Sequence, residues 1–283
     1  MTHFDFYIRC KPQVDIRDIL PTGSLPERKT MNIVLITGAS SGIGREFARQ
    51  MDAYFTNIDE FWLIARRKEL LQELAGELQH KCRILTMDVT SDAQLERLQD
   101  TLEEQHAVIR MLINCAGYGI LGHFAGQNRV EQSGMVRLNC EALTNITHIC
   151  LPFMRRGSRI IQLASSAAFL PQTDFAVYAA TKSYVLSLSK ALAYELNEQG
   201  IYVTAVCPGP VDTPFFDIAE RNGSTLTIKK LTMVSPQRVV ALALKDSYYR
   251  KKMSVCGPIM KLFHVSAKLL PNDLFLNAMK LLK

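Results

Sequence analysis

The sequence has no run of 18 uninterrupted apolar residues and no pair of cysteines with the C-x-x-C spacing of a zinc or redox site. Its seven cysteines are an odd number, so we expect free thiols in a reducing compartment. Residues 1–20 lack the basic start and apolar core of a signal peptide. These absences predict a cytoplasmic protein with no bound metal and no membrane-spanning helix.

Charge of one sign is not concentrated anywhere along the chain. Lys and Arg number 33 against 27 Asp and Glu, a formal net charge of +6, and the densest basic group, residues 250–252, is short. A solvated surface accounts for this pattern, so nucleic-acid binding is not predicted. Gly and Pro are also few, at 15 and 11, while 48% of residues are hydrophobic, which predicts a globular protein with a sizeable core.

From residue 31 onward, apolar β-rich runs alternate with amphipathic helical patterns. Helices are expected at 69–78 and 183–196, and strands are expected at 33–37, 61–65, 83–87, 109–113, 159–163 and 201–206. Strands that alternate with helices predict an α/β fold with a doubly wound, Rossmann-like parallel sheet. With no internal repeat or long linker, residues 31–257 are expected to form a single domain.

Two segments lie outside this alternation. Residues 1–30 show no clear periodicity and are expected to be an N-terminal extension, either native or a consequence of where the chain has been started. Residues 258–283 have a helix-like apolar pattern with interspersed lysines, broken at Pro271. We expect an amphipathic C-terminal helical tail packed on its own domain or on a partner subunit, with contact to a membrane surface as the alternative.

The first strand runs directly into a glycine-rich turn and then a helix, the context that a dinucleotide site requires. Glycines allow a tight turn and close approach to the pyrophosphate, and the helix N-terminus favours an anion. The cofactor-binding residues expected here are Gly38, Ser40, Ser41, Gly42, Ile43 and Gly44.

The end of the second strand indicates which cofactor is bound. NAD-selective versions of this fold carry an acidic residue there, whereas this chain has Arg66 and Arg67. Paired guanidinium groups suit a 2′-phosphate, which predicts NADP(H), although two solvated arginines at the start of a helix would leave the preference open.

Two later strand ends are expected at the same edge of the sheet. Asp88, followed by Val89, is a candidate partner of the adenine, and the turn at 114–117 contributes Asn114, Ala116 and Gly117 near the nucleotide. Ordinary turn chemistry is the alternative at both positions.

A tyrosine and a lysine stand four residues apart at the start of a helical pattern. Tyr178 and Lys182 therefore lie on one helix face, where the ammonium can lower the pKa of the phenol. This pair alone is a weak signal, because a surface Tyr and Lys share such spacing by chance.

In combination, these motifs resemble the short-chain dehydrogenase/reductase family over about residues 31–257. The family's T-G-x-x-x-G-x-G, N-N-A-G and Y-x-x-x-K patterns match residues 37–44, 114–117 and 178–182. Cys115 stands where the family has its second asparagine, which puts a side-chain hydrogen bond from that position in doubt.

The resemblance implies further site residues. The catalytic serine is Ser165, 13 residues before Tyr178, with the adjacent Ser166 as the alternative. Asn139 is implied to hold a water that joins Lys182 to solvent. The family's P-G element after the sixth strand implies that the nicotinamide end of the cofactor is bound by Pro208, Gly209, Val211 and Thr213.

The function implied by the resemblance is NADP-dependent interconversion of a secondary alcohol and a ketone or other carbonyl. Tyr178 would donate the proton, Ser165 would hydrogen-bond the carbonyl oxygen, and Lys182 would contact the ribose. The apolar segment from Pro214 to Thr232 favours a lipophilic substrate: steroid-like, ketoacyl, or another aromatic or aliphatic carbonyl. The alternative is a non-catalytic NADP-binding regulatory protein.

The resemblance also implies a homodimer or homotetramer, with the helix at 183–196 as a candidate interface.

Overall fold

The computed structural model describes residues 30–55, 57–222, 232–273 and 276. The predicted N-terminal extension, apart from residue 30, and most of the segment beyond Pro271 lie outside the described residues, as does most of the second half of the apolar segment after Pro214.

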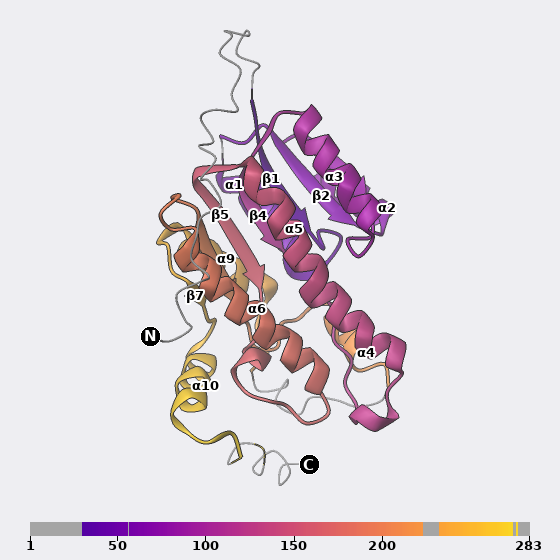
Figure 1. The fold of residues 1–283 in the computed structure, drawn as a ribbon, viewed down its shortest axis with the longest axis vertical. Helices are drawn as coiled ribbons and strands as arrows, with labels where there is room; N and C mark the ends of the chain where they lie inside the picture. Colours follow the sequence, from indigo (N-terminus) through magenta and orange to yellow (C-terminus); the bar gives the residue numbers. More distant parts are fainter. Residues whose placement is uncertain (1–29, 56, 223–231, 274–275, 277–283) are drawn as a thin grey trace, which may run out of the picture.

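The centre of the molecule is a seven-stranded parallel sheet with the order β3-β2-β1-β4-β5-β6-β7 (Figure 1). The strands are β1 (Met31–Thr37), β2 (Glu60–Ala65), β3 (Cys82–Thr86), β4 (Ala107–Asn114), β5 (Met154–Leu163), β6 (Tyr202–Val206) and β7 (Met253–Ser254). The predicted α/β fold is confirmed, and the strand order reverses between β1 and β4. A crevice at the carboxyl ends of the strands is expected at such a reversal.

Helices cover both faces of the sheet (Figure 1). One face packs against α1 (Gly42–Tyr54), α2 (Lys68–Glu77) and α9 (Pro236–Tyr248), and the other against α3 (Asp92–Glu104), α5 (Leu143–Cys150) and α6 (Ala176–Glu195). Further helices are α4 (Arg129–Val136), α7 (Phe215–Ala219) and α10 (Pro258–Leu269), and a π-helical turn, η3 (Arg137–Ala142), joins α4 to α5. Short 3-10 turns are η2 (Phe124–Gly126), η4 (Leu151–Phe153) and η5 (Ser166–Phe169).

The alternation of side chains along a strand divides the core into two layers. In β1, Ile33 and Leu35 pack toward α3, α5 and α6, whereas Val34 and Ile36 pack toward α1, α2 and α9. All four side chains are fully buried, because a parallel sheet covered by helices on both faces has no solvent-facing side. Burial on both faces explains why these strands are continuous apolar runs in the sequence.

Two element boundaries and one additional strand differ most from the sequence-based expectation. The strand expected at 159–163 begins earlier, at Met154, because Met154 pairs with Ile109 of β4 before a register shift. The helix expected at 183–196 begins at Ala176, so it includes Tyr178 and Lys182 in its first two turns. The short β7 was not predicted, since two residues are too few to show a strand periodicity.

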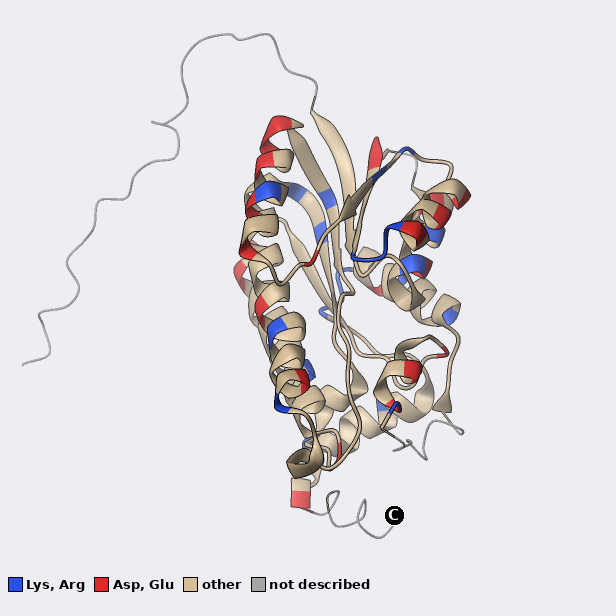
Figure 2. Ribbon diagram, turned by 90° about the vertical axis from the view of Figure 1, so that its right-hand side faces the viewer, with Lys and Arg blue, Asp and Glu red and all other residues tan. Residues whose placement is uncertain are grey.

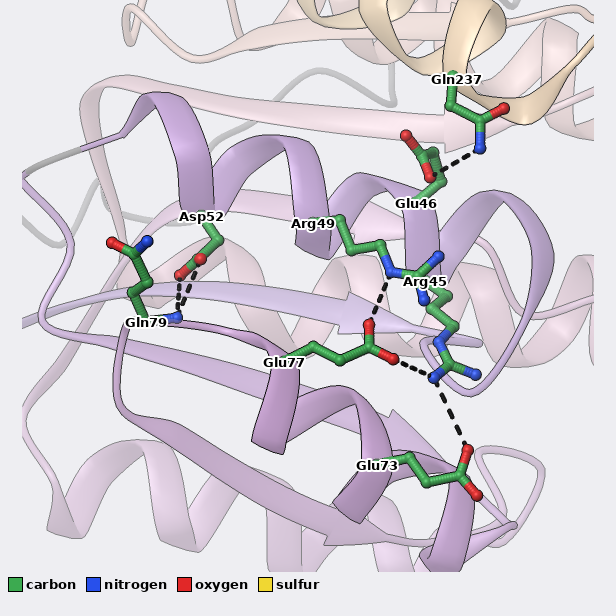
Figure 3. A network of polar contacts seen from close by, with 8 residues as sticks. All are labelled: Arg45, Glu46, Arg49, Asp52, Glu73, Glu77, Gln79 and Gln237. Carbon is green, nitrogen blue, oxygen red and sulfur yellow. Dashed lines mark hydrogen bonds and ion pairs between the residues drawn. The ribbon is translucent and has the colours of Figure 1, made fainter.

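Polar contacts fix α1 relative to α2 just behind the glycine-rich turn (Figure 3). Arg45 and Arg49 of α1 both donate to Glu77 at the end of α2, at 2.6 and 2.7 Å, and Arg45 also lies 3.7 Å from Glu73. Nearer the end of α1, Asp52 accepts hydrogen bonds from the backbone N–H of Gln79. The first helix is therefore held in place by charge-assisted contacts as well as by its buried apolar face.

The surface has acidic and basic residues interspersed over the helices and connecting segments (Figure 2). Within the residues that the structure describes, no helix is both long and apolar enough to cross a membrane. The helix α10 packs on the domain through Met260, which is buried in a core cluster with Val255, and through His264, whose ring stacks on Phe169 at 4.5 Å.

Candidate active site

The turn between β1 and α1 is shaped by glycines that no other residue can replace without strain. Gly38 has φ +68°, and a Cβ there would lie 2.8 Å from the backbone nitrogen of Ala116. A Cβ on Gly44 would collide with the carbonyl of Gly38, and Gly42 has φ +54°. The turn therefore lies flat against the end of β4 and leaves room beside the N-terminus of α1 for an anionic group.

Arg67 is anchored to this turn. Its Nη2 donates to the hydroxyls of Ser40 and Ser41 at 2.9 and 2.8 Å, so the guanidinium is held beside the glycine-rich backbone. Arg66 is exposed on the same rim. The end of β2 thus presents two cations to the cavity and no carboxylate of its own.

The end of β3 contributes Asp88 and Val89 to the cavity wall. Asp88 lines the cavity and accepts from the backbone N–H and hydroxyl of Thr90 at 2.9 and 2.7 Å. Burial opposes ionisation, but the Thr90 hydrogen bonds and the charge of Arg66 hold the pKa of Asp88 below its usual value. The adjacent Val89 is buried and also lines the cavity.

Asn114 lies behind the cavity wall rather than in it. Its amide donates to Gln162 at 3.0 Å and to Thr147 at 3.1 Å, which ties β4 to β5 and α5. Ala116 and Gly117 of the same turn do line the cavity. Asn114 was predicted among the cofactor contacts, and in the structure its side chain points into the interface between the sheet and α5, where it positions the turn.

Tyr178 and Lys182 are both buried at the start of α6 and line the cavity together. The phenol ring stacks on Phe175 with centroids 4.3 Å apart, and Lys182 Nζ lies 5.7 Å from the centre of the Tyr178 ring. The ammonium donates to the carbonyl of Leu163 at the end of β5, at 2.8 Å. The predicted i, i+4 pair is thus brought to the carboxyl edge of the sheet.

The pKa shift of Tyr178 comes from its burial and from Ser165, and not from Lys182. Burial raises the pKa of Tyr178 to about 12, and the opposing contribution comes from a hydrogen bond with the Ser165 hydroxyl. Burial also lowers the pKa of Lys182 to about 8, since a desolvated ammonium is disfavoured. Since the pKa of Tyr178 is raised, the phenol holds its proton at neutral pH.

The structure distinguishes the two candidate serines. Ser165, the N-cap of η5, lies close enough to the Tyr178 phenol to lower its pKa, and its Oγ accepts from the backbone N–H of Ala167 at 3.1 Å. Ser166 lines the same cavity, and its backbone N–H donates to the carbonyl of Pro208 at 2.8 Å. The geometry therefore supports Ser165 as the serine beside the phenol.

Asn139 is fully buried in the π-helical turn η3, one layer behind Lys182. Its amide donates to the carbonyl of Tyr118 and to the hydroxyl of Thr181, and its Oδ1 accepts from the backbone N–H of Tyr118. The side chain does not line the cavity, and its three polar contacts hold the 117–118 backbone against α6. π-helical turns of this kind recur at functional sites.

The segment after β6 closes the other side of the cavity. Val211 forms an isolated parallel bridge with Val234, and Thr213 lies against the glycine-rich turn, since a Cβ on Gly42 would be 3.3 Å from the Thr213 side chain. All four predicted residues of this segment line the cavity: Pro208, Gly209, Val211 and Thr213.

These elements enclose a cavity of about 1010 Å³ at the carboxyl end of the sheet. Beyond the predicted residues, its wall includes Phe175, Tyr118 and three residues of α10: Ile259, Met260 and Phe263. Phe175 precedes Tyr178 by three residues, so helical spacing offered a signal for it. Nothing in the local sequence of α10 signals that it reaches the site. Among the described residues there is no cluster of three His, Cys, Asp or Glu that suits a metal ion.

The chain is similar to known short-chain dehydrogenases in sequence and in structure. The family model for short chain dehydrogenases matches residues 32–222. A short-chain dehydrogenase from Sphingobium yanoikuyae in complex with NADPH is 30% identical and has a TM-score of 0.69, with 89% of this chain and 95% of that chain covered.

Two further similar proteins are a reductase and an alcohol dehydrogenase by name. Sulfoacetaldehyde reductase 2 of Chromohalobacter salexigens is 35% identical over 191 residues, which are 65% of this chain and 74% of that protein. The bulky-bulky ketone specific alcohol dehydrogenase of Comamonas testosteroni is 26% identical with a TM-score of 0.63, and the match covers 80% of this chain and 85% of that one.

Proposed function

This chain belongs to the short-chain dehydrogenase family and is an oxidoreductase acting on CH–OH groups, and we propose that it is an NADP-dependent reductase of lipophilic ketones. One observation carries the proposal. A single cavity has a glycine-rich turn with two arginines at one end, and Ser165 and Tyr178 beside aromatic side chains at the other. Cofactor and carbonyl would therefore meet at the phenol.

The cofactor end of the cavity fits a nicotinamide dinucleotide with a 2′-phosphate. The cradle at Gly38 and Gly44 is one that a Cβ would fill, which leaves backbone N–H groups open to a pyrophosphate. Arg66 and Arg67 would hold the 2′-phosphate, since Ser40 and Ser41 already fix the Arg67 guanidinium at this rim. When bound, NADP(H) supplies or accepts the hydride. The Sphingobium relative, which binds NADPH, supports this assignment.

The proton chemistry falls to Tyr178. With its pKa raised to about 12, the phenol is protonated at neutral pH and is in the state required to donate a proton to a carbonyl oxygen. Ser165 hydrogen-bonds the phenol and would also bond that oxygen, which fixes the carbonyl between them. Lys182, with its pKa lowered to about 8, can return to Tyr178 the proton that the phenol has donated. Asn139 positions the Gly117 backbone beside Lys182.

The substrate end is lined by aromatic and aliphatic side chains. Phe215 lies 5.4 Å from the Tyr178 ring, and Leu121 and Phe216 pack in the same apolar cluster. Arg221 also lines this end, but it forms an ion pair with Glu131. Such a chamber favours an uncharged lipophilic carbonyl such as an aryl, steroid-like or ketoacyl compound. The Comamonas relative, whose name specifies bulky ketones, supports this choice.

The test follows NADPH absorbance with a panel of aryl, steroid, ketoacyl and short aliphatic carbonyls and with sulfoacetaldehyde. We expect the highest kcat/KM with a bulky neutral ketone, and loss of at least about 1,000-fold in kcat in Tyr178→Phe with unchanged NADPH binding. The matched control is Tyr184→Phe, six residues along α6, whose hydroxyl contacts Thr144 outside the cavity. NADPH binding without turnover on any carbonyl or matching alcohol would contradict the proposal.

We further propose that the protein assembles as a homodimer or homotetramer through α6. Tyr184 and Tyr194 are exposed on this helix, and large aromatic side chains are enriched at subunit interfaces. A solution mass that corresponds to a monomer at all concentrations would contradict this.

A further inference from the structure

The helix α10 has one side packed against the domain and one side open to solvent. One side faces the domain through the buried Met260 and His264. The other side is open to solvent, although it consists of large apolar residues: Ile259 is 54% exposed, Leu262 70%, Val265 54%, Leu269 77% and Leu270 44%. We call these five residues the α10 stripe. Because the first four are three or four residues apart, they form one continuous row along the helix.

Basic residues border the stripe. Lys261 and Lys268 are both exposed, and no Asp or Glu occurs in the sequence from Pro258 to Leu270. Both lysines also line a shallow hollow of about 430 Å³ beside α9 and β7, together with Lys251. The one carboxylate among the described residues that line this hollow, Asp246, is ion-paired with Lys251 at 2.7 Å. The exposed surface of α10 therefore combines apolar side chains with two lysines that form no ion pair with any described residue.

The same helix forms part of the wall of the substrate cavity. Ile259 belongs to the stripe and lines that cavity, and Met260 and Phe263 line it from the inner side. Figure 1 shows α10 at the periphery of the molecule, beyond β7. An apolar compound that reached the stripe would thus be one helix away from the apolar chamber beside Tyr178.

We propose that α10 docks on the surface of an anionic lipid bilayer, with the stripe buried among the upper acyl chains and Lys261 and Lys268 among the headgroups. An amphipathic helix with leucines on one face and lysines at its border has the composition that binds such an interface. Lipid docking also explains why an exposed apolar row adjoins a cavity suited to lipophilic compounds. Entry of the substrate from the bilayer rests on the proposed function, whereas the docking itself does not.

A second copy of the chain fits this surface less well. In an antiparallel two-fold contact the same patch of both copies meets, and Lys261 and Lys268 of both subunits would lie along the same edge. Like charges at such a contact oppose it, whereas anionic lipid headgroups neutralise them. Charge complementarity therefore selects the bilayer.

The experiment is co-sedimentation of the full-length protein with vesicles of phosphatidylcholine alone and of phosphatidylcholine with phosphatidylserine. We expect binding to the anionic vesicles, weakened at least about 10-fold by Leu262→Ser with Leu269→Ser and weakened also by Lys261→Gln with Lys268→Gln or by added salt. The matched control, Tyr54→Ser with Val130→Ser, removes exposed apolar side chains from α1 and α4 and should bind as the original protein does. Circular dichroism melts verify that each variant is folded.

Two results would overturn the proposal. One is an original protein that stays in the supernatant with anionic vesicles. The other is a dimer in solution that Leu262→Ser with Leu269→Ser converts to a monomer, with no vesicle binding, since the stripe would then be covered by a second copy. Because no substrate is present, failure of docking is distinct from failure of the reductase proposal, which the turnover assay tests by itself.

Discussion

The ammonium of Lys182 donates a 2.8 Å hydrogen bond to the carbonyl oxygen of Leu163, the last residue of β5. This contact attaches α6 to the carboxyl edge of the sheet and holds a buried cation beside the Tyr178 ring. Burial of that cation is costly, and the pKa of Lys182 is lowered to about 8 as a result. The site is therefore built at the expense of stability.

Removal of the buried charge should stabilise the protein while abolishing activity. Below pH 8 the folded protein holds Lys182 charged in a place that disfavours the charge, so stability rises as pH increases from about 8 toward the ordinary lysine value near 10.4. At pH 7 we expect Lys182→Met to raise the free energy of unfolding by about 1–2 kcal/mol after loss of the Leu163 hydrogen bond.

Urea denaturation at pH 7 and pH 9.5 without added cofactor measures this effect. The gain from Lys182→Met should shrink at pH 9.5, because the unmutated protein is by then uncharged at this position. Lys190→Met, two turns farther along α6, is the control. A variant that is less stable than the original protein at both pH values would contradict the interpretation.

The two adjacent serines should differ in effect. Ser165 lowers the pKa of the Tyr178 phenol and Ser166 does not, while the backbone N–H of Ser166 is bonded to Pro208. We expect Ser165→Ala to reduce kcat about 100-fold and Ser166→Ala less than about 3-fold. Steady-state kinetics with the best ketone of the panel measures both. Equal losses in the two variants would show that the assignment of the serine is wrong.

The arginines at the end of β2 should determine cofactor preference. Each charge-assisted hydrogen bond to a phosphate contributes about 1.5–3 kcal/mol, so Arg66→Ala with Arg67→Ala should lower the ratio of NADPH to NADH affinity by about 100-fold or more. Fluorescence titration with both cofactors measures the ratio. Arg97→Ala on α3, whose guanidinium contacts only the Ala93 carbonyl among the described hydrogen bonds, is the control. An original protein that prefers NADH would refute the role assigned to these arginines.

The Glu77 contacts should stabilise the protein in a pH-dependent way. Hydrogen bonds from Arg49 and Arg45 lower the pKa of this carboxyl, so its contribution is present above the ordinary glutamate value near 4.3 and is lost as pH falls through the lowered value. Because the pair is solvent-accessible, we expect Glu77→Gln to lower the melting temperature by only about 2–4 °C at pH 7.

Differential scanning calorimetry at several pH values tests the Glu77 prediction. The difference between the original protein and Glu77→Gln should narrow below about pH 4 and in high salt. Glu73→Gln, whose carboxylate lies 3.7 Å from Arg45 and is more exposed, should have a smaller effect at every pH. A difference that does not change with pH would assign the loss to packing rather than to charge.

Much of the fold can be predicted from the sequence because the patterns that indicate each strand, turn and helix lie within short segments of the chain. The buried strands are continuous apolar runs, and the two-residue alternation assigns Ile33 and Val34 to opposite faces without any tertiary information. The turn at Gly38 requires a positive φ and a close approach, which only glycine permits. Tyr178 and Lys182 share a helix face by spacing alone.

Other features depend on neighbours that are distant in the sequence. The pKa of Tyr178 is raised because the fold buries the phenol against Phe175 and residues of the 118–121 segment, and desolvation depends on the surroundings rather than on the Lys182 spacing. Asn114 faces Gln162 and Thr147 because the β4–β5 register and the packing of α5 place these groups opposite it. Neither outcome follows from a motif.

The sequence by itself thus determined the alternating strands and helices, the glycine-rich turn and the Tyr178–Lys182 pair, since each rests on backbone sterics or on spacing within one element. Only the tertiary structure decided the desolvation that raises the pKa of the Tyr178 phenol, the direction of the Asn114 side chain and the position of α10 at the cavity. These depend on desolvation and on contacts between elements far apart in the chain, and both arise only when the chain packs.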